Sequence, residues 1–106
     1  MPLTDTCGRS LCQKFTICNR RGLHARASAR FVRTVECFDA KVEVTCNGSS
    51  VGGTSIMGLM MLGAGAGTDI FVSASGRQAR EVLEAIAQLV TSGFDEDEDG
   101  IKEEIS

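Results

Sequence analysis

The single histidine of the chain, His24, stands in the segment GLHARASARF, at the start of an alanine-rich helical pattern. The first turn of a helix carries backbone N–H groups without helical partners and the positive end of the helix dipole, so anions bind well there. Arg26 follows two residues later, and Arg20 and Arg21 come just before the histidine. An imidazole in this setting can attack a phosphoryl group, and guanidinium groups can hold the phosphate oxygens. A surface or capping histidine without chemistry is the alternative that these residues leave open.

A second candidate region is the segment TSIMGLMMLG, where an almost uninterrupted apolar run follows Ser55. Thr54 or Ser55 is expected to cap a short helix over residues 56–62. A helix without a polar stripe cannot bury every side chain in so small a domain, so we expect a mixture of core positions and an exposed, methionine-rich patch for partners. Ser55 could accept a phosphate at this helix N-terminus, although a capping role alone would account for it.

The remaining motifs argue against other chemistry. The cysteines are odd in number and include no CxxC pair, which favours reduced thiols, and their spacing relative to the histidine predicts no metal site. They are Cys7, Cys12, Cys18, Cys37 and Cys46. Neither GxxxxGK[ST] nor a strand-linked GxGxxG is present, so the glycines between residues 52 and 67 are interpreted as turns and helix ends. Nucleic-acid binding by the arginines is a weaker alternative, because the aromatic residues are five phenylalanines and the net charge is −3.

Hydrophobic periodicity predicts the elements that must position these residues. The expected order is a strand over 11–18, a helix over 24–36, a strand over 40–46, a turn at Asn47-Gly48 leading to a second short strand, a helix over 56–62, a strand over 68–75 and a helix over 76–90 that ends at Gly93. In the first helix, Ala25, Ala29, Val32 and Val35 or Glu36 fall near the i, i+4, i+7 positions of one stripe, and Arg26, Arg30 and Arg33 share another. This order is typical of an α+β domain whose helices pack on one face of a sheet.

Length and charge predict how the chain is organised. Its 106 residues indicate one domain, which we expect over residues 11–93, between a flexible N-terminal segment over 1–10 and an acidic, disordered tail over 94–106. Residues 1–94 carry a formal charge of +3 and residues 95–106 carry −6. The tail is expected to be a solubilising end, with weak electrostatic regulation of the basic face as the alternative. No apolar run reaches 18 residues and the N-terminus is unlike a secretory signal, which predicts a cytoplasmic protein without membrane insertion.

With these residues in place, the sequence resembles the HPr family, the histidine-containing phosphocarriers of the bacterial phosphoenolpyruvate-dependent phosphotransferase system. GLHARASARF resembles the family's active-site signature, and TSIMGLMMLGAGAGTDI resembles its regulatory-serine signature. The resemblance covers about residues 11–92 and rests on two motifs at the family's spacing. It implies an HPr-like fold, which is an open-faced β-sandwich with a four-stranded antiparallel sheet and three helices on one face.

The resemblance also implies a role for individual residues. His24 would be the phosphoryl acceptor, through its Nδ1 nitrogen, and Arg26 would help to hold the phosphate. Ser55 would be the site that an ATP-dependent HPr kinase modifies in organisms that have one. The surface that docks partners would include Ile56, Met57, Met60, Met61, Arg21 and Arg30.

The implied partners are enzyme I of the phosphotransferase system, an EIIA-type acceptor and, where it exists, an HPr kinase/phosphorylase. The protein would be a monomeric covalent carrier rather than an enzyme, would need no cofactor, and would leave most of the catalysis to its partners. The alternative is a regulatory protein of the nitrogen-related phosphotransferase chain that acts mainly by binding other proteins.

One position departs from the family pattern, because Ala27 stands where the family usually has proline after the arginine. Proline suits the first turn of a helix, where backbone N–H groups have no helical partner. Alanine restores one donor and removes the fixed φ angle. We expect the site to survive this change with an altered partner preference or transfer rate.

Overall fold

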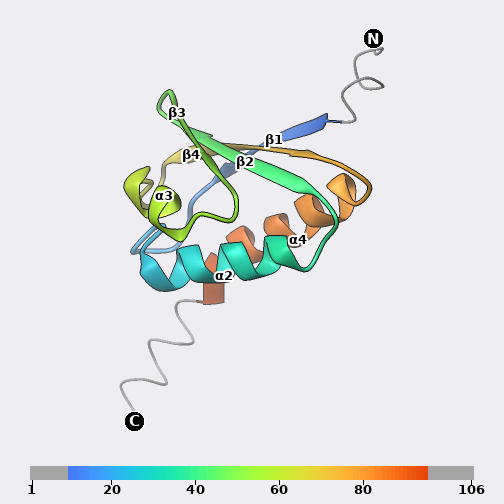
Figure 1. Ribbon diagram of the computed structural model, residues 1–106. Helices are drawn as coiled ribbons and strands as arrows, with labels where there is room; N and C mark the ends of the chain where they lie inside the picture. The colour runs from blue at the N-terminus through green and yellow to red at the C-terminus, as the bar shows by residue number, and fades with distance from the viewer. Residues whose placement is uncertain (1–9, 96–106) are drawn as a thin grey trace.

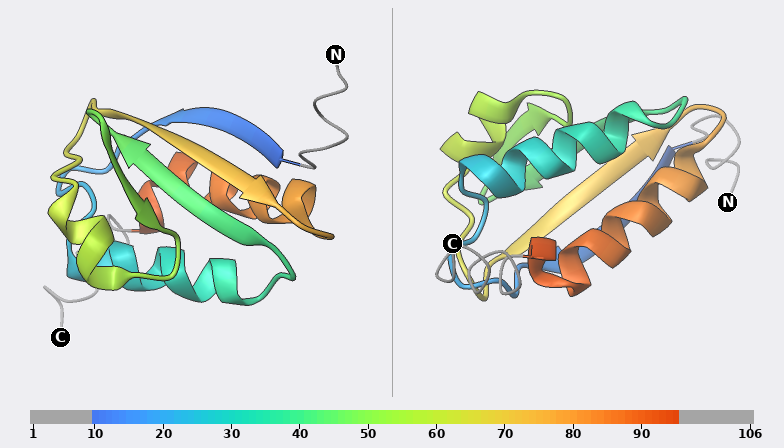
Figure 2. Two further views of the ribbon diagram at one scale, coloured as in Figure 1. Left: turned by 45° about the horizontal axis from the view of Figure 1, so that its top comes forward. Right: turned by 90° about the horizontal axis from the view of Figure 1, so that it is seen from below.

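The computed structural model describes residues 10–95 of the chain, and within them it forms a four-stranded antiparallel sheet and three α-helices (Figure 1). The elements are β1 (Ser10–Thr16), α2 (Ala25–Glu36), β2 (Lys41–Cys46), β3 (Ser49–Gly52), α3 (Ile56–Met61), β4 (Asp69–Ser75), α4 (Ala79–Thr91) and a 3₁₀ turn, η1 (Gly93–Asp95). The strand order is β1-β4-β2-β3. Helices α2 and α4 lie side by side across one face of the sheet, and α3 flanks α2 and β3 (Figure 2). The predicted open-faced sandwich is therefore confirmed.

The strands follow the alternation of apolar and polar residues along the chain. On β2, Val42, Val44 and Cys46 are buried, while Glu43 on the same strand is exposed. The β2–β3 hairpin turns at Asn47-Gly48, where both residues have positive φ angles of 51° and 84°. This is the backbone that a two-residue hairpin turn requires and that the Asn-Gly pair adopts most readily.

Helix α2 buries a different stripe from the one that the alanine pattern predicts. The buried positions include Ala27, Phe31 and Val35, whereas Ala25 is exposed and Ala29 is only half-buried. Of the residues on the predicted stripe, Val32 and Val35 are buried, whereas Ala25, Ala29 and Glu36 are not. Phe31 is fully buried, and because a phenylalanine gains about 1.5–3 kcal/mol on burial, it sets the rotation of the helix more strongly than the alanines do.

Helix α4 buries one apolar face and ends at a glycine. In α4, Val82, Ile86 and Val90 are buried against the sheet, and Gly93 follows the helix end with a positive φ of 68°, as expected for a glycine that terminates a helix. Phe94, which was predicted to belong to the disordered tail, is instead buried in the core with 2% of its surface exposed. The predicted segments over 1–10 and 94–106 otherwise lie outside the described residues, apart from Ser10 and Asp95.

Two general features of the described part bear on function. None of its helices is long and apolar enough to cross a bilayer. Its four cysteines are free thiols, and of these Cys12, Cys18 and Cys37 are exposed and Cys46 is buried.

Candidate phosphorylation site

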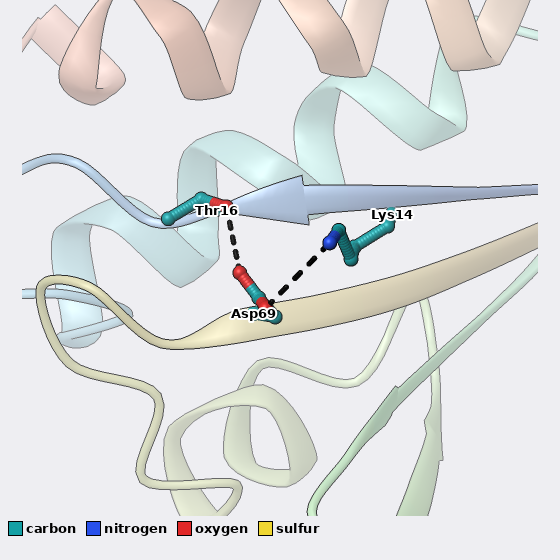
Figure 3. Close-up of polar contacts among 3 residues, drawn as sticks. All are labelled: Lys14, Thr16 and Asp69. Atoms are coloured by element: carbon teal, nitrogen blue, oxygen red, sulfur yellow. Dashed lines mark hydrogen bonds and ion pairs between the residues drawn. The ribbon is translucent and has the colours of Figure 1, made fainter.

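The segment that carries His24 is the loop between β1 and α2, and its start is fixed by polar contacts at the end of β1. Asp69, at the beginning of β4, accepts a hydrogen bond of 2.6 Å from Thr16 Oγ1, and its other oxygen lies 3.9 Å from Lys14 Nζ (Figure 3). These groups are exposed, so the ion pair contributes little to stability. Their position shows where the loop departs from the sheet.

Backbone contacts hold the loop against the segment that follows α3. The Ile17 N–H donates to Thr68 O at 2.9 Å, and the Leu23 N–H donates to Ala64 O at 3.0 Å. Gly22 has a φ of 66°, and a Cβ at this residue would lie 2.2 Å from Ala64 O. Only glycine allows this approach between the two backbones, because it has no Cβ and tolerates positive φ. The loop is therefore pinned to a second segment before it reaches the histidine.

His24 is the N-cap residue of α2. Its backbone is extended, and its Nδ1 accepts a hydrogen bond of 3.2 Å from the backbone N–H of Arg26. Its carbonyl oxygen accepts the Ser28 N–H at 2.8 Å, which begins the helical hydrogen bonding. A neutral imidazole that accepts at Nδ1 carries its proton on Nε2. The lone pair of Nδ1 is therefore aimed at the positive end of the helix.

The charges around this helix end favour an anion. Arg20, Arg21 and Arg26 are exposed, and Arg30 is half-buried on the same helix. No Asp or Glu occurs between residues 6 and 35, and the first turn of α2 holds no acid. Exposed guanidinium groups and backbone N–H groups at a helix N-terminus both bind phosphate oxygens well.

Ser55 occupies the same position on a different helix. It is the N-cap of α3, and its exposed Oγ accepts a hydrogen bond of 3.0 Å from the Gly58 N–H. Of the two expected caps, Thr54 and Ser55, the structure therefore uses Ser55. A Cβ at Gly58 would lie 2.9 Å from Ser55 Oγ and 3.0 Å from Val51 Cβ, so the tight turn around this cap favours a glycine.

Helix α3 divides its apolar side chains between core and surface, as expected. Leu59 is fully buried, whereas Met57 and Met61 are 69% and 79% exposed. Ile56 and Met60 are also exposed. Because α3 lies alongside the N-terminal half of α2 (Figure 1), these side chains and the arginines of α2 belong to neighbouring elements.

Two further contacts shape the site geometry. Asn19 is buried, and its Nδ2 donates to Gly22 O at 2.8 Å, which closes the turn before the histidine. Asparagine and glycine are typical turn residues, and a turn over residues 19–22 could therefore be predicted. The contact between Gly22 and Ala64 could not, because it joins segments about forty residues apart in the sequence.

Comparisons with known proteins agree with this geometry. A protein-family model described as the PTS HPr component phosphorylation site matches residues 11–92. The phosphocarrier protein HPr of Neisseria meningitidis serogroup A is 46% identical over 86 residues, covering 81% of this chain and 97% of that protein. The phosphocarrier protein NPr of Shewanella violacea is 37% identical, covering 79% of this chain and 92% of that protein.

Solved structures extend the likeness to the fold. The crystal structure of HPr-C-His from Thermoanaerobacter tengcongensis has a TM-score of 0.77 and 35% identity, covering 80% of this chain and 96% of that one. An HPr dimer from the same organism has a TM-score of 0.64 and 38% identity, covering 76% and 92%.

The fold and the site together define a small α+β domain with a histidine at the N-terminus of its first long helix. The matched family model and the similar proteins identify the family to which this domain belongs. The chain belongs to the HPr family of phosphocarrier proteins of the phosphotransferase system.

Proposed function

We propose that the protein accepts a phosphoryl group from enzyme I on Nδ1 of His24 and passes it to an EIIA-type acceptor. The observation that carries the proposal is the orientation of Nδ1, which faces the Arg26 N–H at the start of α2 in a chain that matches the family model. The carrier itself needs no cofactor, because the donor supplies an already activated phosphoryl group. Its contribution is to position the imidazole and to hold the phosphate.

The transfer step follows from this geometry. The Nδ1 lone pair attacks phosphorus, the Nδ1–P bond forms, and the bond between phosphorus and the donor breaks with its electron pair leaving to the donor. The Arg26 N–H, which Nδ1 accepts at 3.2 Å before attack, is released and donates to a phosphoryl oxygen. The Arg26 guanidinium adds positive charge as negative charge accumulates. In the second transfer the acceptor attacks phosphorus, and Nδ1 recovers its lone pair.

Partner docking is assigned to the surface formed by α2, the loop before it and the neighbouring α3. We assign the contacts to the apolar side chains of Ile56, Met57, Met60 and Met61 and to the charged Arg21 and Arg30. The support is that the four apolar residues are exposed, and large exposed apolar side chains that lie together are typical of interaction sites. Methionine adapts to partners of different shape, which suits a protein that must bind a donor and an acceptor in turn. We expect the protein to do this as a monomer.

Ser55 is proposed as a regulatory site for an HPr kinase. Its hydroxyl is exposed at the start of α3, beside the proposed docking side chains. A phosphate there would add negative charge at a helix N-terminus, where the fold tolerates it, and would repel an acidic partner surface.

The test is phosphorylation from phosphoenolpyruvate by enzyme I, measured by intact mass. The wild-type chain is expected to gain one acid-labile phosphoryl group. His24→Ala and His24→Asn are expected to gain none, and the asparagine variant keeps a good N-cap, so it separates lost chemistry from lost folding. Phosphorylation of either variant by enzyme I would contradict the assignment.

The same assay decides the branch of the system. It is run with a sugar-type and a nitrogen-type enzyme I, and we expect faster transfer from the sugar-type donor because the 46% identity to an HPr exceeds the 37% identity to an NPr. Faster transfer from the nitrogen-type donor would support the alternative, a regulatory protein of the nitrogen-related chain.

A further inference from the structure

The C-terminal end of the described chain is anchored in the core. Phe94 is 2% exposed although its φ of 57° lies in the left-handed region, which bulky residues rarely adopt. A strained backbone of this kind persists only when the surrounding packing holds it. The direction in which the chain leaves the domain is therefore set by the burial of Phe94.

This anchor lies beside the loop that carries His24. The Cys18 Sγ donates a hydrogen bond of 3.1 Å to Val90 O near the end of α4, and a Cβ on Gly93 would lie 3.5 Å from Cβ of Asn19. In Figure 2, the end of α4 and the loop between β1 and α2 are next to each other. The residues that follow Asp95 therefore begin close to the site.

The two neighbouring segments have opposite charges. Residues 95–106 hold seven acidic residues and one lysine. The segment from residue 10 to residue 35 holds six basic residues and no acid, and Arg20, Arg21 and Arg26 within it are exposed. The carboxylate beside the start of the loop, Asp69, lies 3.9 Å from Lys14, which offsets its charge.

The lengths of chain are sufficient for contact. Asn19 and His24 are five residues apart, so at most about 18 Å of extended chain separates them. Eleven residues follow Asp95, and extended they would span about 40 Å. The acidic segment is therefore long enough to reach Arg20, Arg21 and Arg26 from its starting point beside Asn19.

We propose that the acidic segment 95–106 docks on the arginines around His24 in the unphosphorylated protein and competes there with acidic partner surfaces. A phosphoryl group on His24 brings negative charge to the same place, so it weakens this docking by like-charge repulsion. The segment therefore slows capture of the donor and does not hinder release of the phosphorylated carrier. This kinetic consequence rests on the proposed function, whereas the docking itself does not.

The experiment compares the full chain with a variant of equal length in which Glu96, Asp97, Glu98, Asp99, Glu103 and Glu104 are replaced by Gln or Asn. Backbone amide signals of Arg20, Arg21 and Arg26 are expected to differ between the two proteins at low salt and to converge at high salt, because salt screens exposed charges. The control removes two acids from the N-terminal half of α4, by Glu81→Gln and Glu84→Gln. These substitutions should leave the amide signals of the loop unchanged. Identical loop signals in full chain and neutral-tail variant at low salt would overturn the docking.

A second measurement tests the competition. The initial rate of phosphorylation at low enzyme I concentration is expected to rise about fivefold in the neutral-tail variant and by much less at high salt. Shifted amide signals with an unchanged rate would overturn the competition. If no variant is phosphorylated at all, the proposed function fails, and the amide signals still decide whether the segment docks.

Discussion

His24 and Ser55 are both N-cap residues, but the helices that they begin differ in length and in charge. His24 precedes the twelve-residue helix α2, and the exposed side chains around this cap include Arg20, Arg21 and Arg26. Ser55 precedes the six-residue helix α3, whose exposed side chains are apolar and which has neither an acid in its first turn nor a base in its last. The same capping hydrogen bond, from a backbone N–H to a side chain, thus occurs in two different environments.

The difference indicates two different uses for a phosphate. At His24, guanidinium groups lie close to the cap and the nucleophile is a nitrogen, which suits a phosphoryl group that arrives and leaves. At Ser55, no arginine or lysine occurs within the helix that follows, and a phosphate would instead change the charge of an apolar surface. The first environment favours transfer, and the second favours control of binding.

The largest effect is expected from removing the basic side chain that lies nearest to the histidine in the sequence. Arg26→Ala keeps the backbone N–H that His24 accepts but removes the guanidinium, so the phosphorylation rate should fall about 100-fold, as for loss of one stabilising donor in a transition state. Arg26→Lys should recover part of this loss, because it restores the charge without the planar pair of donors. Single-turnover rates with saturating enzyme I measure both. A rate for Arg26→Ala equal to wild type would remove the proposed contrast between the two caps.

A smaller effect is expected at Ser55, and two substitutions separate charge from capping. Ser55→Asp keeps a good N-cap and adds a negative charge, so the enzyme I concentration for half-maximal rate should rise about tenfold, a cost of about 1.4 kcal/mol, with the maximal rate unchanged. Ser55→Ala removes the cap and should cost about 1 kcal/mol of stability with little effect on that concentration. Kinetic titration and thermal unfolding are the two measurements. Equal kinetic effects of Asp and Ala would show that capping, not charge, matters at Ser55.

The features that the sequence predicts correctly are those set by a few neighbouring residues. Asn47-Gly48 predicts its hairpin, and Ser55 before an apolar run predicts a capped helix, because turn and cap chemistry depend on a few adjacent residues. His24 with Arg26 likewise defines a phosphate site at a helix start. The element order was sufficient to predict the α+β class, and the strands and helices lie within a few residues of their expected bounds.

What could not be predicted depends on packing between distant segments. The rotation of α2 follows Phe31, whose burial outweighs the alanine pattern. The approach of Gly22 to Ala64 and the burial of Phe94 both require the folded arrangement of loops and helix ends. These three features determine the orientation of α2, the path of the histidine loop and the point where the acidic segment begins. The residues of the site are therefore easier to predict than their arrangement in space.

The smallest expected effect concerns Ala27, which stands where the family usually has proline. Its N–H belongs to the first turn of α2, close to the Arg26 N–H that Nδ1 accepts, and is oriented toward the same end of the helix. We expect this N–H to donate to the phosphoryl group on His24, so Ala27→Pro should shorten the half-life of the phosphorylated form about threefold, the value of one ordinary hydrogen bond. Ala27→Gly keeps the N–H and serves as the control for a changed side chain at this position, which is buried in the wild type. Intact mass followed over time in buffer without partners gives the half-lives. A proline variant that loses its phosphate at the wild-type rate would mean that the Arg26 N–H and guanidinium hold the group alone, and the contrast with Ser55 would then rest on arginine rather than on the helix end.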